Sequence, residues 1–448
     1  MLDKILSKLS QNKRKIISNV VWALLGKVAT SLGVFFVGVL VARYLGPEQY
    51  GLMNYVISFV TLFTVIAAFG FDSITVRELA KTPEQRDEIM GSAFWTRIAF
   101  STLAYILVLL IGFFSHSNSE TFLMIALYGL YLFTTPFTVI RNYFTSIVQN
   151  KYIVKSEISR TCIGALIKIL LLYFKFPLIY FVCAAAFDFV LVAGGYVISY
   201  KTMVGSLNKW KLDFSIAKFL CFESWPLALS SSAIIVYQKI DQVMIKNMID
   251  DDSVGYFATA ASFMALVMFL PGILSQTITP MLVKLKRENE LAYLEKRQIF
   301  TNIMVWGTLI ISVVISLNSY CIIKLTYGDS YIAAVPVLQI LSWKTFGAAL
   351  SEASGHLIII DGKQKWVFVR NLFGSIACVF FNLILIPLWG IEGSALVAVI
   401  TTLITGFLSL AIIPSYRTIF KVELNAILWG WKDLIHIKKF FYVRQNRT

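Results

Sequence analysis

Residues 41–72 read VARYLGPEQYGLMNYVISFVTLFTVIAAFGFD, and their pattern indicates how the chain is built. This stretch holds the end of one apolar run and the whole of another, with a short gap at Gly46–Gln49 between them. A spanning helix needs about 20 predominantly apolar residues to cross a hydrocarbon core of about 30 Å. Both runs, near 17–43 and 50–70, are long enough, so the stretch predicts two membrane-spanning helices joined by a tight turn.

The same pattern continues in both directions along the 448 residues, of which 58% are hydrophobic. Other predicted turns are equally short, as at Gly390–Glu392. The sequence therefore predicts an all-α polytopic membrane protein with about twelve transmembrane helices. They are expected near 17–43, 50–70, 89–114, 121–140, 156–175, 177–199, 222–247, 254–279, 300–322, 332–360, 367–388 and 391–413.

The basic residues follow the order of these spans. Lys and Arg crowd every second gap and both ends of the chain, whereas the other gaps hold only Arg43, Lys175, Lys246 and Lys324. Cytoplasmic loops carry such an excess of Lys and Arg. We therefore expect both termini in the cytoplasm. The net charge of +15 is then a topology signal, and it does not indicate a nucleic-acid partner.

An internal repeat indicates two halves. Gly51 is followed by Ser58, Phe59 and Leu62, and Gly255 is followed at the same spacings by Ser262, Phe263 and Leu266. Halves of equal orientation are related by an axis along the membrane normal. The linker and the tail combine aromatic residues with Lys and Arg, as interfacial helices do. The predicted parts are a cytoplasmic N-terminus (1–15), an N-lobe (16–200), an amphipathic linker (201–221), a C-lobe (222–414) and a basic tail (415–448).

Several charged residues fall inside the predicted spans. A charge at the centre of such a helix costs about 2.5–3.5 kcal/mol even on the lenient insertion scale, so most should face a cavity or a partner. Arg160, Glu223 and Arg370 lie near cytoplasmic ends and are expected to extend to the membrane surface. The cations expected to line a cavity are Lys27, Arg97, Lys168, Lys239 and Lys344.

Uncharged polar residues share faces with some of these charges. The predicted polar lining comprises Asn19 and Ser31 beside Lys27, Asn54, Ser58 and Thr61 on the next helix, and Ser230 and Tyr237 beside Asp241. Such faces on adjacent helices suggest the wall of a water-filled cavity. The alternative is a helix–helix interface joined by small and polar residues.

The acidic residues suggest pairs. Lys168 and Asp188 lie at similar depth on neighbouring helices, which predicts an ion pair. Lys239 and Asp241 are two residues apart and point to opposite faces, so at least one needs a partner on another helix.

Glu352 and His356 are one turn apart on a single helix. They could exchange protons or simply hydrogen-bond to each other.

Chemical motifs are absent. The sequence has no GxxxxGK[ST], HExxH or nucleophile motif, and its five cysteines have no CxxC spacing. We expect no catalysis, no metal and no cofactor. The surplus of positive charge inside the spans favours an anionic ligand, so a transporter is the default interpretation.

Three segments resemble the bacterial polysaccharide flippases of the Wzx type, in the multidrug/oligosaccharidyl-lipid/polysaccharide superfamily. ARYLGPEQYG, within the opening stretch, resembles the end of their first helix and the start of their second. WPLALSSSAIIVYQKIDQVMI (225–245) resembles their seventh helix, and LPGILSQTITPML (270–282) the end of their eighth. The resemblance covers roughly residues 16–415.

The resemblance implies two six-helix lobes around a central cavity, in the bacterial inner membrane. It implies transport of an undecaprenyl-pyrophosphate-linked oligosaccharide by alternating access, for O-antigen or capsule synthesis, with the lipid tail left among membrane lipids. Cavity cations would hold the pyrophosphate, and Lys27 and Lys239 match that role. A polysaccharide polymerase is the implied protein partner. H⁺ or Na⁺ coupling would use Asp188, Asp241, Glu352 and His356.

Rival functions fit less well. A drug or metabolite exporter of the same fold would be expected to have a more acidic cavity. A polymerase or ligase would need a large outer loop with catalytic groups, and none is present in the sequence. A scaffold would not explain charges in mid-membrane. The related lipid II flippases carry several arginines along their first helix, where this chain has Lys27 and, at the outer end, Arg43.

Overall fold

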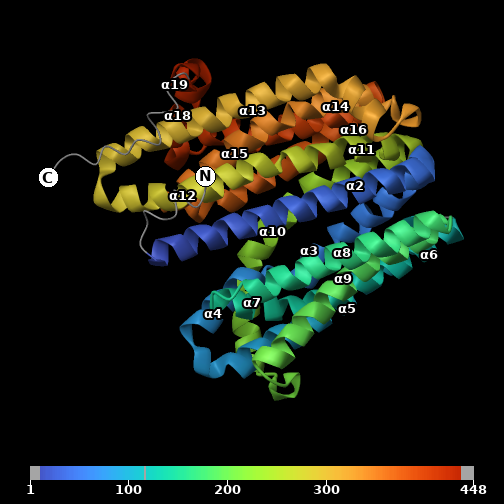
Figure 1. The fold of residues 1–448 in the computed structure, drawn as a ribbon, viewed down its shortest axis with the longest axis horizontal. Coiled ribbons are helices and arrows are strands. Elements are labelled where there is room, and N and C mark those ends of the chain that lie inside the picture. Colours follow the sequence, from blue (N-terminus) through green and yellow to red (C-terminus); the bar gives the residue numbers. More distant parts are fainter. Residues whose placement is uncertain (1–10, 116–117, 435–448) are drawn as a thin grey trace. The chain divides into compact units, whose positions relative to one another are not determined.

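The computed structural model describes the backbone of residues 11–115 and 118–434, and the side chains of 30–115 and 118–432. These residues are helical with short breaks and include no strand, which confirms the all-α prediction (Figure 1). They form two compact units. The first contains the chain up to Val41 and residues 66–224, and the second contains 42–65 and the chain from Trp225 onward.

Eight helical segments of the described chain are long and apolar enough to cross a membrane. They are Thr30–Lys81, Pro83–Ser115, Ser119–Ser146, Leu178–Met203, Phe214–Met248, Asp251–Glu288, Glu290–Thr326 and Gln364–Ile412. The first and last have 52 and 49 residues. At about 1.5 Å per residue each would be about 75 Å long if it were straight, more than twice the hydrocarbon core. The count of twelve spans stays a prediction.

Glycine corners interrupt the two longest helical segments where the sequence predicts turns. α2 (Gln11–Leu62) bends at Gly46, with φ 73° and ψ 173°. α16 (Val367–Leu403) bends at Gly390, with φ 60° and ψ −139°. Glycine adopts positive φ at no steric cost because it lacks a Cβ atom. Pro47 then opens the next segment, where its missing N–H is not needed.

The first unit is a bundle closed by the linker. Its elements are α3 (Thr64–Ala68, from residue 66), α4 (Phe71–Lys81), α5 (Arg86–Ser115), α6 (Ser119–Gly129), the 3₁₀ segment η2 (Leu130–Phe137), α7 (Thr138–Ser146), α8 (Lys151–Tyr173), α9 (Leu178–Met203) and the start of α10 (Phe214–Met248). Phe71, Met90 and Phe144 lie in its core. Lys211 N donates to Asp87 O at 3.2 Å, so the linker is tied to the start of α5.

The predicted linker has no amphipathic helix of its own. A short 3₁₀ segment covers Leu207–Lys209, and residues 214–221 form the first turns of α10. Asp213 caps the start of α10. Its Oδ1 accepts hydrogen bonds from the backbone N of Ser215 at 2.7 Å and from the backbone N of Ile216 at 3.1 Å. Ser92 Oγ donates to Asp213 O at 3.0 Å and fixes the cap against α5.

The second unit contains the remaining helices. They are α11 (Asp251–Val267), α12 (Phe269–Glu288), α13 (Glu290–Thr326), α14 (Ala334–Ser342), α15 (Lys344–Ile360), α16, the π-helical turn η6 (Ile404–Leu408), α17 (Ser409–Ile412), the 3₁₀ turn η7 (Pro414–Tyr416), α18 (Arg417–Trp429) and α19 (Trp431–Leu434). Figure 1 shows α13 running beside α14 and α15. Tyr293, Phe300 and Leu357 lie in the core of this unit.

Residues 42–65 belong to the second unit and contact the C-terminal end of α13. Arg43 Nε donates to Thr326 O, and Arg43 Nη2 donates to Leu325 O, both at 2.6 Å. These are the last carbonyls of α13, which otherwise lack intrahelical donors. Tyr331 Oη also donates to Ala42 O at 2.7 Å. Arg43 therefore acts as a helix cap.

The two glycines of the internal repeat face each other. A Cβ atom on Gly51 would lie 1.8 Å from Asp251 O and 2.7 Å from Gly255 N. A Cβ atom on Gly255 would lie 2.2 Å from Pro47 O. The spacing of 204 residues that relates Gly51 to Gly255 also relates Pro47 to Asp251. The contact, called the glycine seam below, is thus reciprocal: each copy of the repeat places its glycine against the other copy's helix start.

Candidate functional site: charged side chains within the helices

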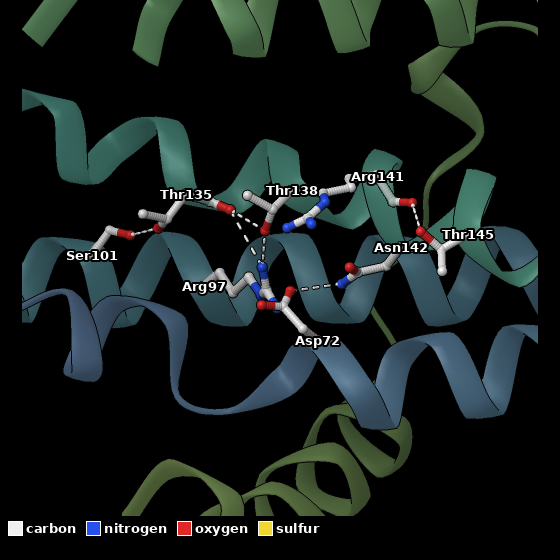
Figure 2. A network of polar contacts seen from close by, with 8 residues as sticks. All are labelled: Asp72, Arg97, Ser101, Thr135, Thr138, Arg141, Asn142 and Thr145. Atoms are coloured by element: carbon white, nitrogen blue, oxygen red, sulfur yellow. Dashed lines mark hydrogen bonds and ion pairs between the residues drawn. The ribbon is translucent and has the colours of Figure 1, made fainter. Parts of the chain in front are cut away.

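Arg97 is the most buried of the described cations, with 1% of its side chain exposed. Its Nη2 donates to Asp72 Oδ1 at 2.8 Å, and its Nη1 donates to Thr138 Oγ1 and, at 3.4 Å, to Thr135 O. Asn142 Nδ2 donates to the same Asp72 oxygen at 2.9 Å. Figure 2 shows these groups converging from α4, α5, η2 and α7. Arg97 therefore has an internal counter-charge.

The backbone before Asp72 prepares this contact. Phe69 and Gly70 have φ of 43° and 67°, which ends the preceding helix and starts α4 in a new direction. Phe71 is then buried beneath the guanidinium, with Arg97 Cζ 5.6 Å from its ring centre. Asp72 remains 56% exposed, so its second oxygen is accessible. Arg141 lies in the same network and is exposed.

The predicted ion pair between Lys168 and Asp188 is confirmed. Lys168 Nζ lies 2.5 Å from Asp188 Oδ2, joining α8 to α9. Gly164 makes the approach feasible, because a Cβ atom there would lie 2.0 Å from Asp188 Oδ1. The first unit thus neutralises two of the predicted cavity cations, Arg97 and Lys168.

The second unit brings Lys344 into electrostatic range of both Lys239 and Asp241. Asp241 is 2% exposed, and its Oδ1 accepts from Asn382 Nδ2 at 2.7 Å and from Cys378 Sγ at 3.5 Å. Asp241 therefore faces α16, which confirms that at least one of Lys239 and Asp241 has a partner on another helix. The three charged groups come from α10 and α15.

Lys239 differs from Arg97 and Lys168. Among the residues that the structure describes, it forms no ion pair, and its main charged neighbour is another cation, Lys344. A cation in this position lacks the compensation that burial demands. Lys239 is thus a cation that lacks a counter-anion within the part of the chain that the structure describes.

Glu352 and His356 contact each other as predicted, with His356 Nε2 3.3 Å from Glu352 Oε1. The other ring nitrogen, His356 Nδ1, lies 3.1 Å from Thr279 Oγ1 of α12. Glu352 is 42% exposed. The pair is therefore a hydrogen-bonded unit with one accessible end.

Arg370 differs from the prediction that it extends to the membrane surface. It is 7% exposed, and its Nη1 donates to Ser354 Oγ at 3.4 Å. Ser354 of α15 contacts it and Glu423 of α18 lies within electrostatic range, neither of which a hydropathy pattern reveals. Glu223, in contrast, is partly exposed and pairs with Arg77 at 3.0 Å, as its position near a helix end suggests.

The predicted polar lining is dispersed. Ser58 is fully buried and donates to Gln242 Oε1 at 2.5 Å, which favours the helix–helix interface for this residue. Ser230 Oγ accepts from Asn371 Nδ2 at 3.1 Å. Asn54 and Thr61 donate to carbonyls of their own helix, Ser31 is partly buried, and Tyr237 is near Arg370. The side chains of Asn19 and Lys27 lie outside the described residues.

Sequence reasoning missed Asp72 and Asn382. Asp72 falls just beyond a predicted span, so it reads as a loop residue and not as the partner of Arg97. Asn382 lies one turn after Cys378 in an apolar run. A single amide side chain in such a run is the feature that could have marked it as a functional residue.

Comparison with known proteins identifies the family of the chain. The family model described as polysaccharide biosynthesis protein matches residues 16–286. The capsular polysaccharide biosynthesis protein CapF of Staphylococcus aureus is 22% identical, covering 86% of this chain and 96% of its own. A putative O-antigen transporter of Shigella flexneri is 21% identical, covering 85% of this chain and 93% of its own.

Solved structures share the fold. The lipid II flippase MurJ, in an inward closed conformation, superposes with a TM-score of 0.66 at 16% identity, covering 93% of each chain. An inward-facing multidrug resistance transporter of the MATE family, in the MOP superfamily, gives a TM-score of 0.61 at 16% identity, covering 92% of this chain and 96% of its own. The family match spans more than half of the sequence. The chain belongs to the polysaccharide biosynthesis protein family, and its fold is that of the MOP transporters.

Proposed function

We propose that the protein flips an undecaprenyl-pyrophosphate-linked oligosaccharide from the cytoplasmic to the outer leaflet of the bacterial inner membrane, by alternating access, for O-antigen or capsule synthesis. The observation that carries the proposal is Lys239, a cation inside a spanning helix without an acidic partner among the described residues. A pyrophosphate supplies the missing negative charge. Both termini are cytoplasmic in this proposal, and a polymerase consumes the product.

The test uses a strain that lacks the gene. Lipid-linked oligosaccharide in the membrane and polysaccharide at the surface are measured together, with the polymerase intact. We expect the lipid-linked intermediate to accumulate and the surface polymer to disappear, with both effects reversed when the gene is restored. Unchanged intermediate and polymer would refute the proposal and favour a drug or metabolite exporter, to be assayed next with efflux substrates.

Substitution of Lys239 tests the anion site. We expect Lys239→Ala to abolish surface polysaccharide while the protein still inserts, because the pyrophosphate loses its counter-charge. Lys239→Arg should retain activity if charge alone matters. Lys27→Ala should behave as Lys239→Ala does. Surface polysaccharide is measured in each complemented strain, together with membrane abundance of the variant.

The matched control is Lys324→Ala, which removes a half-exposed lysine at the end of α13. It should leave surface polysaccharide unchanged. Normal polymer in the Lys239→Ala strain would remove Lys239 from the binding site.

We further propose that Asp241 serves ion coupling with H⁺ or Na⁺. It is a buried carboxylate held by Asn382 and Cys378, and Asn382 Oδ1 has no partner among the described residues. Carboxylate and amide oxygens suit hard cations, and a buried carboxylate also suits a proton. Asp188 and the Glu352–His356 pair are the other candidates for this role.

Asp241→Asn should uncouple transport from the ion gradient. Coupling free energies are typically about 1–3 kcal/mol, so we expect roughly a 5- to 150-fold smaller response to the gradient in vesicles. Cys378→Ser is the control, since it keeps a donor beside the carboxylate. An unchanged gradient response in Asp241→Asn would exclude this residue as the coupling group.

A further inference from the structure

The carboxyl group of Glu423 has no place in the proposed transport mechanism, yet it is completely buried. It lies in the middle of α18, after the last spanning segment, and its exposed fraction is 0%. Neither of its oxygens forms a hydrogen bond of normal geometry with a described residue, although the Ser354 hydroxyl lies close by and donates to Leu350 O at 2.8 Å. A buried carboxylate without such partners is unfavourable, whereas the protonated form is tolerated. The protonation state of Glu423 therefore affects how well α18 packs.

The nearest cation does not neutralise Glu423. Arg370 of α16 is close enough to interact electrostatically with it, but the two form no ion pair at contact distance. Arg370 instead donates to Ser354 Oγ of α15, and its Nε has no partner among the described residues. Arg370 and Glu423 thus lie near each other in the same interior without a shared hydrogen bond.

Several charged groups on the elements around α18 are engaged elsewhere, and α17 has none. They are Glu352 and His356 of α15, which contact each other; Tyr416 of η7, which donates to Lys363 O; Tyr293 and Arg297 of α13, which contact Asp361; and Lys432 of α19, which lies over the rings of Trp429 and Trp431.

Two side chains of α13 hold the backbone of α18 in its docked position. Gln298 Nε2 donates to Val422 O at 2.9 Å, and Trp306 Nε1 donates to Ala426 O at 2.8 Å. These bonds flank Glu423 along α18, so the helix cannot turn to expose the carboxyl without breaking them. Exposure of Glu423 requires undocking of α18.

We propose that Glu423 is a proton-binding site that couples the docking of α18 to pH. Burial raises the pKa of Glu423 well above its usual range, and the charge of Arg370 opposes this shift. When α18 undocks, the carboxyl is solvated and its pKa returns towards about 4.3. Since the docked form has the higher pKa, docking is strongest below the solvated pKa and weakens as pH rises through the docked pKa.

The test is hydrogen–deuterium exchange of the α18 backbone amides, on the full-length protein in lipid nanodiscs at about pH 6 and about pH 9, which bracket the range documented for buried carboxyl groups. Wild type is compared with Glu423→Gln, a neutral residue of the same shape. The matched control is Glu295→Gln, which removes an exposed carboxyl from α13. Variants are compared at equal pH, so the intrinsic pH dependence of exchange cancels.

At about pH 9 we expect α18 to exchange about tenfold or more faster in wild type and Glu295→Gln than in Glu423→Gln, because each pH unit between the solvated and the docked pKa weakens docking about tenfold. At about pH 6 this difference should be smaller, because fewer pH units separate that pH from the solvated pKa of about 4.3. Equal exchange at about pH 9, or an unprotected α18 in Glu423→Gln at both pH values, would overturn the proposal.

A second measurement does not depend on the variant folding. In wild type, exchange in α18 is divided by exchange in the middle of α13. The proposal requires this ratio to rise between about pH 6 and about pH 9. A constant ratio overturns it.

Discussion

Asp72→Ala will destabilise the first unit more than Arg97→Leu, although Asp72 is the more exposed of the two residues. Removing Asp72 leaves the guanidinium of Arg97, which is 1% exposed, without a counter-charge. Breaking a buried pair in this way typically costs about 3–5 kcal/mol. Arg97→Leu removes the buried charge itself and leaves only a half-exposed carboxylate, still bonded to Asn142.

A double-mutant cycle measures this asymmetry. Thermal unfolding is followed for wild type, Asp72→Ala, Arg97→Leu and the double variant. We expect the double variant to be more stable than Asp72→Ala, because removal of Arg97 relieves the unpaired charge.

The control is the Arg77–Glu223 pair of the same unit, whose side chains are 49% and 36% exposed. Its disruption by Glu223→Ala should cost at most about 1 kcal/mol. Equal losses in Asp72→Ala and Glu223→Ala would show that burial of Arg97 does not determine the energy of its ion pair.

Gly51→Ala and Gly255→Ala will each disrupt the glycine seam. The added methyl group would lie 1.8 Å from Asp251 O in one case and 2.2 Å from Pro47 O in the other. Both oxygens belong to the backbone, so a whole helix must move to remove the steric overlap. Overpacking of this kind typically costs about 1–3 kcal/mol or more.

Because the contact is reciprocal, the stability of the double variant tests this prediction. Either substitution opens the same seam, so the double variant should lose less stability than the two single losses combined. Gly307→Ala is the control, because nothing lies within 4 Å of a Cβ atom at this position of α13. Alanine there should be neutral or stabilising, by up to about 1 kcal/mol. Additive losses at Gly51 and Gly255 would contradict a shared contact.

Much of the fold could be predicted because apolar runs define the spans and glycine residues define the turns between them. The turns near Gly46 and Gly390 are corners in the structure, and the Lys168–Asp188 pair followed from depth on adjacent helices. Both features depend on short stretches of sequence, which periodicity and turn chemistry describe well.

Features set by packing between distant segments could not be predicted. Asp72 reaches Arg97 because of the backbone turn at Phe69 and Gly70, and nothing in the apolar pattern marks that turn. Arg370 looked like a surface residue because its neighbours Ser354 and Glu423 lie on other helices, and α18, which carries Glu423, belongs to the predicted tail. The start of α10 depends on the cap at Asp213, which merges part of the predicted linker into a spanning helix.

The glycine seam also bears on how such a chain could arise. A contact in which each copy offers its glycine to the other copy's helix start is the contact that two identical subunits make across a two-fold axis. A half-length polypeptide carrying either copy would therefore already possess a self-complementary surface. Joining two such halves would convert a homodimer into one chain without needing a new contact at this place. The two copies would afterwards be free to diverge everywhere except where a side chain would enter the seam.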